Sequence, residues 1–258
     1  MPLNVLILGG SSEASALAGM LAGDTRFAAV LSLAGRTARP APSRLTTRTG
    51  GFGGAEGLAD YLHAHEVDAL VVATHPFAAQ MRINAAAAVR RRPTRLLVID
   101  RPVWTPQASD RWTVAPDMAA AAEALGPTPR RVLLTVGRQE LQPFIDAPHH
   151  AYLVRSIDPP DRLPANAALI LARGPFSEAE ERQLMLDHKV QVLVTKNAGG
   201  AATEAKLLAA RTLGLEVVVV ARRPLPDLEN LDASVAPDAP ATLTWLEHQA
   251  SSTTERGV

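Results

Sequence analysis

The chain contains no cysteine, which excludes disulfide bonds, thiol redox chemistry, iron–sulfur clusters and zinc sites built from thiolates. Aromatic residues make up only 4% of the sequence, and 26 basic residues are balanced by 26 acidic ones. No overall positive field therefore draws the protein to nucleic acid or to an anionic membrane. Residues 1–10 lack the basic start of a secretory signal, and no apolar run is long enough to span a bilayer. We expect a cytoplasmic protein that binds neither nucleic acid nor membranes, with a monomer as the default state.

Lysine is also scarce, because Lys189, Lys196 and Lys206 are the only lysines among the 26 basic residues. The planar guanidinium of arginine suits carboxylates and phosphates better than the ammonium of lysine does. Genomic composition can produce the same bias, since the chain is rich in alanine as well. The positions of the arginines must therefore decide whether the bias serves a function.

Short β-branched or leucine-rich runs alternate with longer alanine-rich stretches of helical period, a pattern typical of α/β proteins with mostly parallel strands. The expected strands are Leu3–Leu8, Phe27–Leu33, Arg44–Arg48, Asp68–Ala73, Arg95–Ile99, Arg131–Val136, Ala151–Val154, Ala168–Leu171, Gln191–Thr195 and Glu216–Val220. The glycine and two prolines of residues 126–129 continue neither a helix nor a central strand. We therefore predict two doubly wound, Rossmann-like domains, residues 1–127 and 128–258, with a cleft between them.

A basic side chain follows almost every expected strand. In open parallel sheets, ligands bind outside the carboxyl ends of the strands. Random placement would instead put many of these cations on helix faces. We therefore predict that the cleft is basic and holds an anionic ligand. The strand-exit cations are Arg36, Arg101, Arg138, Arg155, Arg173, Lys196 and Arg222.

The turn after the first strand, with the sequence Gly-Gly-Ser-Ser at residues 9–12, is a variant of the dinucleotide-binding fingerprint. Gly9 stands at the first glycine of the fingerprint, while Ser11 replaces the second and Ala14 the third. A helix expected over Ser12–Ala22 directs its free N–H groups and positive dipole end toward this turn, where a pyrophosphate can bind. A tight strand-to-helix connection without a ligand is the alternative interpretation.

The end of the second strand favours the cofactor interpretation. A cofactor with a free 2′-hydroxyl usually meets an acidic residue here, whereas a 2′-phosphate is met by arginine. Arg36 and Thr37 occupy this position, roughly 25 residues after the glycine turn, and no acidic residue does. A solvated surface arginine is the alternative, but the position favours NADPH over NADH.

The histidines do not form a recognisable metal site. His63, His65, His149 and His150 lack a third ligand at a suitable spacing, so no metal is predicted. His75 precedes a proline, where a lone histidine more often fixes a strand-end turn than acts as an acid or base. The sequence also lacks a Walker loop, a Tyr-x-x-x-Lys pair and a Gly-x-Ser-x-Gly elbow, which argues against P-loop NTPases, short-chain dehydrogenases and serine hydrolases. No catalytic residue is assigned.

In this order and spacing, the motifs resemble those of the precorrin-6A reductase family of cobalamin biosynthesis. The matching segments are Ile7-Leu8-Gly9-Gly10-Ser11-Ser12-Glu13-Ala14, Ser32-Leu33-Ala34-Gly35-Arg36, Gly51-Phe52-Gly53-Gly54 with Gly57-Leu58, Ala73-Thr74-His75-Pro76-Phe77-Ala78, Arg101-Pro102-Val103-Trp104, and Leu193-Val194-Thr195-Lys196-Asn197-Ala198-Gly199-Gly200 with Lys206. Ala198 departs from the pattern, in which a small hydroxyl residue is expected. The resemblance implies hydride transfer from NADPH to a carbon of the macrocycle, which reduces one double bond of precorrin-6A to give precorrin-6B.

Two sets of binding residues are therefore expected. For NADPH they are Gly9, Gly10, Ser11, Ser12, Glu13, Arg36 and Thr37, with Phe52, Gly53, Gly54, Thr74, His75, Pro76 and Phe77 on its nicotinamide side. For the substrate they are Arg101, Trp104, Arg138, Arg173, Lys196, Asn197, Gly199, Gly200, Lys206 and Arg222. A corrin precursor carries many acetate and propionate groups, which cations at the strand ends can bind. The proton donor stays open between His75, a serine of the first turn, solvent and the substrate's own carboxyls.

Two other functions fit the same sequence. An NADPH-dependent reductase of another polyanionic small molecule would keep the role of Arg36 without the macrocycle. A non-catalytic protein that senses NADP or carries a tetrapyrrole would explain the absence of an obvious acid–base residue. NADPH preference together with the resemblance favours a metal-free substrate over a cobalt-containing one.

Overall fold

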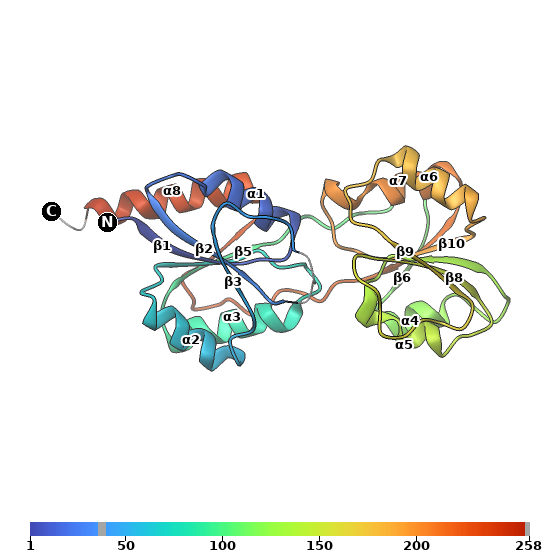
Figure 1. The fold of residues 1–258 in the computed structure, drawn as a ribbon, viewed down its shortest axis with the longest axis horizontal. Coiled ribbons are helices and arrows are strands. Elements are labelled where there is room, and N and C mark those ends of the chain that lie inside the picture. The colour runs from blue at the N-terminus through green and yellow to red at the C-terminus, as the bar shows by residue number, and fades with distance from the viewer. Residues whose placement is uncertain (36–39, 256–258) are drawn as a thin grey trace. The chain divides into compact units, whose positions relative to one another are not determined.

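The computed structural model describes residues 1–35 and 40–255, which fold into two α/β units (Figure 1). The first unit comprises Met1–Arg101 and Arg223–Val258, and the second comprises Pro102–Arg222. Each unit contains one six-stranded sheet in which every strand pair is parallel, so the predicted α/β class is confirmed. No helix of the described residues is both long and apolar enough to cross a membrane.

The sheet of the first unit has the strand order β3-β2-β1-β4-β5-β12. Its strands are β1 Leu3–Leu8, β2 Phe27–Leu33, β3 Thr46–Thr49, β4 Ala69–Val72, β5 Arg95–Ile99 and β12 Ala233–Ala236. Its helices are α1 Ser12–Leu21, α2 Gly54–Ala64, α3 Ala79–Arg91 and α8 Ala239–Glu255. With β12 as the sixth strand, this is the strand order of dinucleotide-binding sheets. Successive strands are added on one side of β1 up to β3, and the chain then returns to add β4 on the other side. Such a reversal between β1 and β4 places a ligand site at the carboxyl ends of these two strands.

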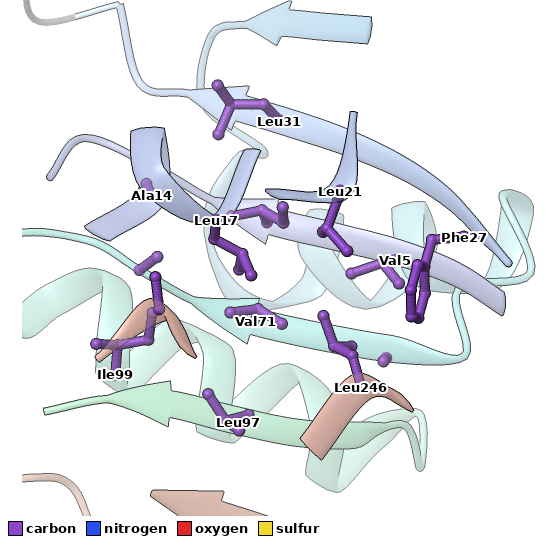
Figure 2. Close-up of a cluster of buried hydrophobic side chains, with 14 of the residues drawn as sticks. Val5, Ala14, Leu17, Leu21, Phe27, Leu31, Val71, Leu97, Ile99 and Leu246 are labelled. Atoms are coloured by element: carbon purple, nitrogen blue, oxygen red, sulfur yellow. The ribbon is translucent and has the colours of Figure 1, made fainter. Parts of the chain in front are cut away.

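Helices cover both faces of this sheet. In Figure 1, α1 and α8 lie together over one face, and α2 and α3 lie together over the other. Val5 of β1 packs with Leu17 and Leu246 on the first face, as Figure 2 shows, whereas Leu6 and Leu8 belong to the cluster on the second. Burial on both faces explains why β1 is a continuous apolar run rather than an alternating one.

The sheet of the second unit has the strand order β9-β8-β7-β10-β11-β6. Its strands are β6 Arg111–Ala115, β7 Arg131–Leu134, β8 Ala151–Ser156, β9 Ala167–Leu171, β10 Val192–Lys196 and β11 Glu216–Val220. Its helices are α4 Met118–Glu123, α5 Gln142–Ile145, α6 Glu178–Asp187 and α7 Ala205–Thr212, with 3-10 turns at Arg138–Glu140 and Ala201–Thr203. Counted from β7, the order matches that of the first sheet, with β6 in the sixth place. The order in which strands are added to the sheet reverses between β7 and β10.

The division into units differs from the predicted boundary between residues 127 and 128. β6 precedes that boundary but pairs with β11 of the second sheet, and β12 follows the whole second unit but pairs with β5 of the first. Residues 126–129 only connect α4 to β7. Gly126 has a φ of 73°, the left-handed conformation that commonly ends a helix. The glycine and prolines therefore mark a helix end within the second unit rather than a link between domains.

His150 is a titratable group in the core of the second unit, where it is 1% exposed. Its Nδ1 accepts the backbone N–H of Arg130 at 3.2 Å. Burial, helped by the positive charges of His149 and Arg130, holds the pKa of His150 below its ordinary value of 6.5. Because the unfolded chain then binds the proton more readily, stability is fully present above pH 6.5 and decreases as the pH falls below it.

We therefore expect the midpoint of thermal unfolding to fall when the pH is lowered from about 7 to about 5. His150→Asn keeps an acceptor for the Arg130 N–H but cannot titrate, so calorimetry should show a flatter pH profile. The matched control is His188→Asn, which alters an exposed histidine. Identical profiles in all three proteins would contradict this account.

Candidate functional site

The turn between β1 and α1 lies at the carboxyl edge of the first sheet, beside the end of β4. Ser11 is the N-cap of α1, and its Oγ accepts the N–H of Ala14 at 3.2 Å and donates to the carbonyl of Ala73 at 2.8 Å. One hydroxyl therefore caps the helix and ties the turn to the residue that follows β4. Gly10 has a φ of 124°, and a Cβ built on it would meet no atom within 4 Å. The turn thus offers open space at a helix N-terminus, as a pyrophosphate requires.

Gly9 is required for a different reason, which is packing. Its N–H donates to the carbonyl of Ser32 at 2.8 Å, and a Cβ on Gly9 would lie 2.6 Å from Cδ1 of Leu31. A side chain here would require the buried Leu31 side chain to shift. Gly9 therefore keeps the close approach that its place in the fingerprint predicts.

Glu13, in the first turn of α1, pairs with Arg101, which follows β5. Nη1 of Arg101 donates to Oε1 of Glu13 at 2.9 Å, and the two side chains are 7% and 15% exposed. Burial alone would raise the pKa of Glu13, but the Arg101 charge and hydrogen bonds from its own backbone, Arg101 and Ser11 lower it below 4.5. Arg101 was expected to face the substrate, and in the structure its guanidinium pairs with Glu13 beside the turn between β1 and α1.

The segment after β4 forms the other side of this edge. Oγ1 of Thr74 is buried and has no hydrogen-bond partner among the described residues. His75 fixes the turn, because its Nδ1 accepts the N–H of Phe77 at 3.2 Å and its carbonyl accepts that of Ala78 at 2.8 Å. A buried hydroxyl without a partner, beside an open glycine turn, fits a polar ligand at the carboxyl ends of β1 and β4.

The glycine loop of residues 50–54 follows β3 and leads into α2. Gly53 and Gly54 have φ values of 81° and 97°, which favour glycine at both positions. Because β3 lies on the β2 side of the sheet, this loop adjoins the half that receives adenosine in dinucleotide-binding sheets. The expectation that Phe52, Gly53 and Gly54 line the nicotinamide is therefore at odds with the strand order.

Arg36 and Thr37, the residues expected at the cofactor 2′-phosphate, lie outside the described residues. The chain enters this segment through Gly35, whose φ is 73°. A Cβ on Gly35 would lie 3.3 Å from Cγ2 of Thr49, the last residue of β3. The ends of β2 and β3 therefore lie close together at the carboxyl edge of the first sheet.

In the second unit, Lys196 lies at the point where the strand order reverses. Its Nζ donates to Oε1 of Glu140 at 3.0 Å, and the side chains are 15% and 40% exposed. Glu140 was not among the predicted site residues, because these were chosen mainly as cations at the strand ends. Arg138, after β7, donates to the carbonyl of Pro159 at 3.4 Å. Lys196 and Arg138 therefore lie at the carboxyl ends of β10 and β7, which are neighbours in the sheet.

Trp104 and Asn197 are joined by their polar atoms. Oδ1 of Asn197 accepts the N–H of Trp104 at 2.9 Å, and its Nδ2 donates to the Trp104 carbonyl at 3.0 Å. Nε1 of Trp104 donates to the carbonyl of Gly200 at 3.1 Å, and Nζ of Lys206 donates to that of Thr203 at 2.6 Å. Gly199 and Gly200 take positive φ values of 66° and 77° beside this contact. Several residues expected to bind the substrate therefore also form hydrogen bonds within the second unit.

Arg173 and Arg222 follow β9 and β11. Arg155, near the end of β8, forms a buried pair with Glu181: its two terminal nitrogens donate to the carboxylate at 2.9 and 2.8 Å. The side chains of this pair are 10% and 3% exposed. An arginine near a strand end can therefore serve the core alone, and position by itself does not assign a ligand role.

Comparison with known proteins places these features in a family. A family model described as precorrin-6x reductase CbiJ/CobK matches residues 4–247. A curated precorrin-6A reductase from Rhodococcus erythropolis is 48% identical over 244 residues, which cover 94% of this chain and 96% of that protein. Another from Rhodobacter capsulatus is 50% identical over 224 residues, covering 86% and 89%. A solved structure of CobK precorrin-6A reductase matches with a TM-score of 0.89 and 46% identity, covering 95% of this chain and 96% of that one.

Proposed function

The chain belongs to the precorrin-6x reductase CbiJ/CobK family of cobalamin biosynthesis, and from this premise we propose that it reduces precorrin-6A with NADPH to give precorrin-6B. The observation that carries the cofactor proposal is the site at the carboxyl ends of β1 and β4. There the open turn at Gly10, the N-terminus of α1 and the partnerless hydroxyl of Thr74 fit a dinucleotide. The relatives named above are called precorrin-6A reductases, without cobalt, which supports a metal-free substrate.

Bound NADPH would supply a hydride, and the residues of the first unit would hold and orient it. The free N–H groups at the start of α1 would bind the pyrophosphate, with the turn held in place by the Ser11 cap, while Arg101 keeps the Glu13 carboxylate turned to one side. The Thr74 hydroxyl would donate to the part of the cofactor that lies over β4. These contacts would fix the reacting carbon of the nicotinamide in one place, which is most of what the protein contributes to hydride transfer.

The cations at the carboxyl edge of the second sheet would bind the carboxylates of the macrocycle. Lys196 ends β10, and Arg138 and Arg222 follow β7 and β11, the strands on either side of it. Arg173 follows β9, at the edge of the sheet. The pair between Lys196 and Glu140 holds the lysine in place, and a substrate carboxylate would compete for its other N–H groups. Arg138 and Lys196 are therefore the strongest substrate candidates.

The direct test mixes purified protein with precorrin-6A and NADPH and follows nicotinamide absorbance and product mass. We expect NADPH oxidation and a product heavier by two hydrogen atoms. No oxidation beyond a substrate-free control would defeat the proposal. Binding of NADPH and the macrocycle without turnover would identify a binding protein, and oxidation only with a cobalt-containing or unrelated polyanion would identify a different reductase.

Arg36→Glu tests the cofactor proposal separately. We expect NADPH affinity to fall by more than about tenfold, or about 1.4 kcal/mol, because the reversed charge repels the 2′-phosphate. NADH, which lacks this phosphate, should bind almost as before. Fluorescence titration with both cofactors measures the two affinities. Equal losses for the two cofactors would show that Arg36 has a structural role only.

A further inference from the structure

Arg48 lies at the carboxyl edge of the first sheet and was not selected from the sequence. In the pairing of β2 with β3 it stands opposite Ser32, one residue before the end of β2. Ser32 links it to the cofactor turn, because the Ser32 hydroxyl accepts from Arg48 and its carbonyl accepts the N–H of Gly9. In dinucleotide-binding sheets, the end of this strand is where the 2′-position of the adenosine ribose is recognised. Arg48 is therefore close to the position at which NADPH and NADH differ.

The guanidinium of Arg48 is fixed by neutral groups. Nη1 donates to Oγ of Ser32 at 2.6 Å and to the carbonyl of Gly50 at 3.2 Å, and Nη2 donates to the carbonyl of Gly51 at 3.2 Å. The guanidinium carbon lies 3.9 Å from the centroid of the Phe52 ring and 5.2 Å from that of Tyr61. These contacts leave the Nε–H and one Nη2–H unused within the described part of the chain. The side chain is rigid but retains donors for a ligand.

Its positive charge is also uncompensated. Across residues 1–35 and 40–255, Arg48 forms no ion pair with a carboxylate. Several other largely buried cations of the two units do form an ion pair with a carboxylate. These pairs are Arg82–Asp100, Arg101–Glu13, Arg155–Glu181 and Lys196–Glu140. A half-buried charge without a counterion is costly unless an anion joins it. The site therefore suits a ligand that brings a negative charge with it.

We propose that Arg48 binds the 2′-phosphate of NADPH and is a determinant of cofactor specificity, an inference that rests on the proposed function. Its rigid fork presents two donors to phosphate oxygens, and Phe52 holds one face of the guanidinium. The glycine loop accepts hydrogen bonds from the same side chain, so the loop conformation and the phosphate site are formed together. This role of Arg48 adds to the one proposed for Arg36.

The test titrates the full-length protein with two fragments that differ by one group, 2′,5′-ADP and 5′-AMP. Arg48→Gln should weaken binding of 2′,5′-ADP by about tenfold or more and change that of 5′-AMP by less than about twofold. Arg48→Lys keeps the charge but loses the fork, so the 2′,5′-ADP affinity should fall between those of the wild type and Arg48→Gln. Arg44→Gln is the matched control, because it removes an exposed arginine close by in the chain, and both affinities should stay within about twofold.

Equal losses for the two fragments in Arg48→Gln would overturn the inference, since they would mean that Arg48 only supports the glycine loop. If Arg48→Gln fails to fold, the selectivity of Arg48→Lys decides in the same way. A wild-type protein that binds both fragments equally would overturn the NADPH proposal and this inference together. Selective binding of 2′,5′-ADP without any reduction of precorrin-6A would contradict the proposed activity but would still support the role of Arg48.

Discussion

Ser11→Asp is expected to weaken NADPH binding by on the order of 100-fold, about 2.7 kcal/mol, without unfolding the first unit. A carboxylate at this N-cap would stand within a few ångströms of the pyrophosphate, where like charges repel by about 4 kcal/mol at the effective dielectric of a protein surface. The helix itself should survive, because aspartate caps helices as well as serine does and favours the dipole. Loss of the bond donated to the Ala73 carbonyl costs about 1 kcal/mol.

Ser11→Asn is the matched control for this prediction. Asparagine is an equally good N-cap, is neutral, and can both accept from the Ala14 N–H and donate to the Ala73 carbonyl. Isothermal titration should therefore show a small loss of NADPH affinity for asparagine and a large one for aspartate, with similar unfolding midpoints. Similar affinities for the two variants would place the pyrophosphate elsewhere.

Gly57→Ala is expected to destabilise the protein and to weaken NADPH binding, although alanine has the higher helix propensity. Alanine in place of a helical glycine normally stabilises a helix by about 1 kcal/mol. A Cβ on Gly57, however, would overlap the backbone carbonyl oxygen of Phe52, which cannot rotate away as a side chain can. Displacing that carbonyl costs about 1–3 kcal/mol and moves the loop that Arg48 holds. The steric effect should outweigh the propensity.

Gly19→Ala provides the comparison, because Gly19 is an exposed glycine of α1 with no atom within 4 Å of a built Cβ. This variant should gain stability by about 0.5–1 kcal/mol and bind NADPH as before. Chemical denaturation and cofactor titration of both variants give the two quantities. If Gly57→Ala were stabilised to the same extent as Gly19→Ala, with unchanged NADPH affinity, the close contact between Gly57 and the Phe52 carbonyl would be contradicted.

The interior strands of both sheets could be predicted from the sequence, as could the edge strands β3 and β9, whereas the edge strands β6 and β12 could not. β1, β2, β5 and β11 begin and end at the predicted residues, because strands covered on both faces are continuous apolar runs. β6 and β12 read Arg-Trp-Thr-Val-Ala and Ala-Ser-Val-Ala, are partly exposed, and lie at sheet edges. Their identity as strands depends on a partner that is distant in the chain. Missing them led to the predicted boundary between residues 127 and 128.

The candidate site was predictable where its chemistry is local. The N-cap at Ser11 and the glycine turn depend on consecutive residues only, and the structure contains both. The cations were less predictable, because their partners are remote: Arg101 bonds Glu13 across 88 positions, and Lys196 bonds Glu140 across 56. Arg48 was missed because its contacts with Ser32 and the glycine loop appear only once β2 and β3 are paired.

A crystal structure of the protein with NADP+ would test the central claim most directly. The account predicts the pyrophosphate at the N-terminus of α1, over Gly10 and Ser11, with the nicotinamide toward Thr74. It places the adenosine 2′-phosphate within hydrogen-bonding distance of Arg48. A dinucleotide bound instead at the carboxyl ends of β7 and β10, with the turn after β1 empty, would contradict it.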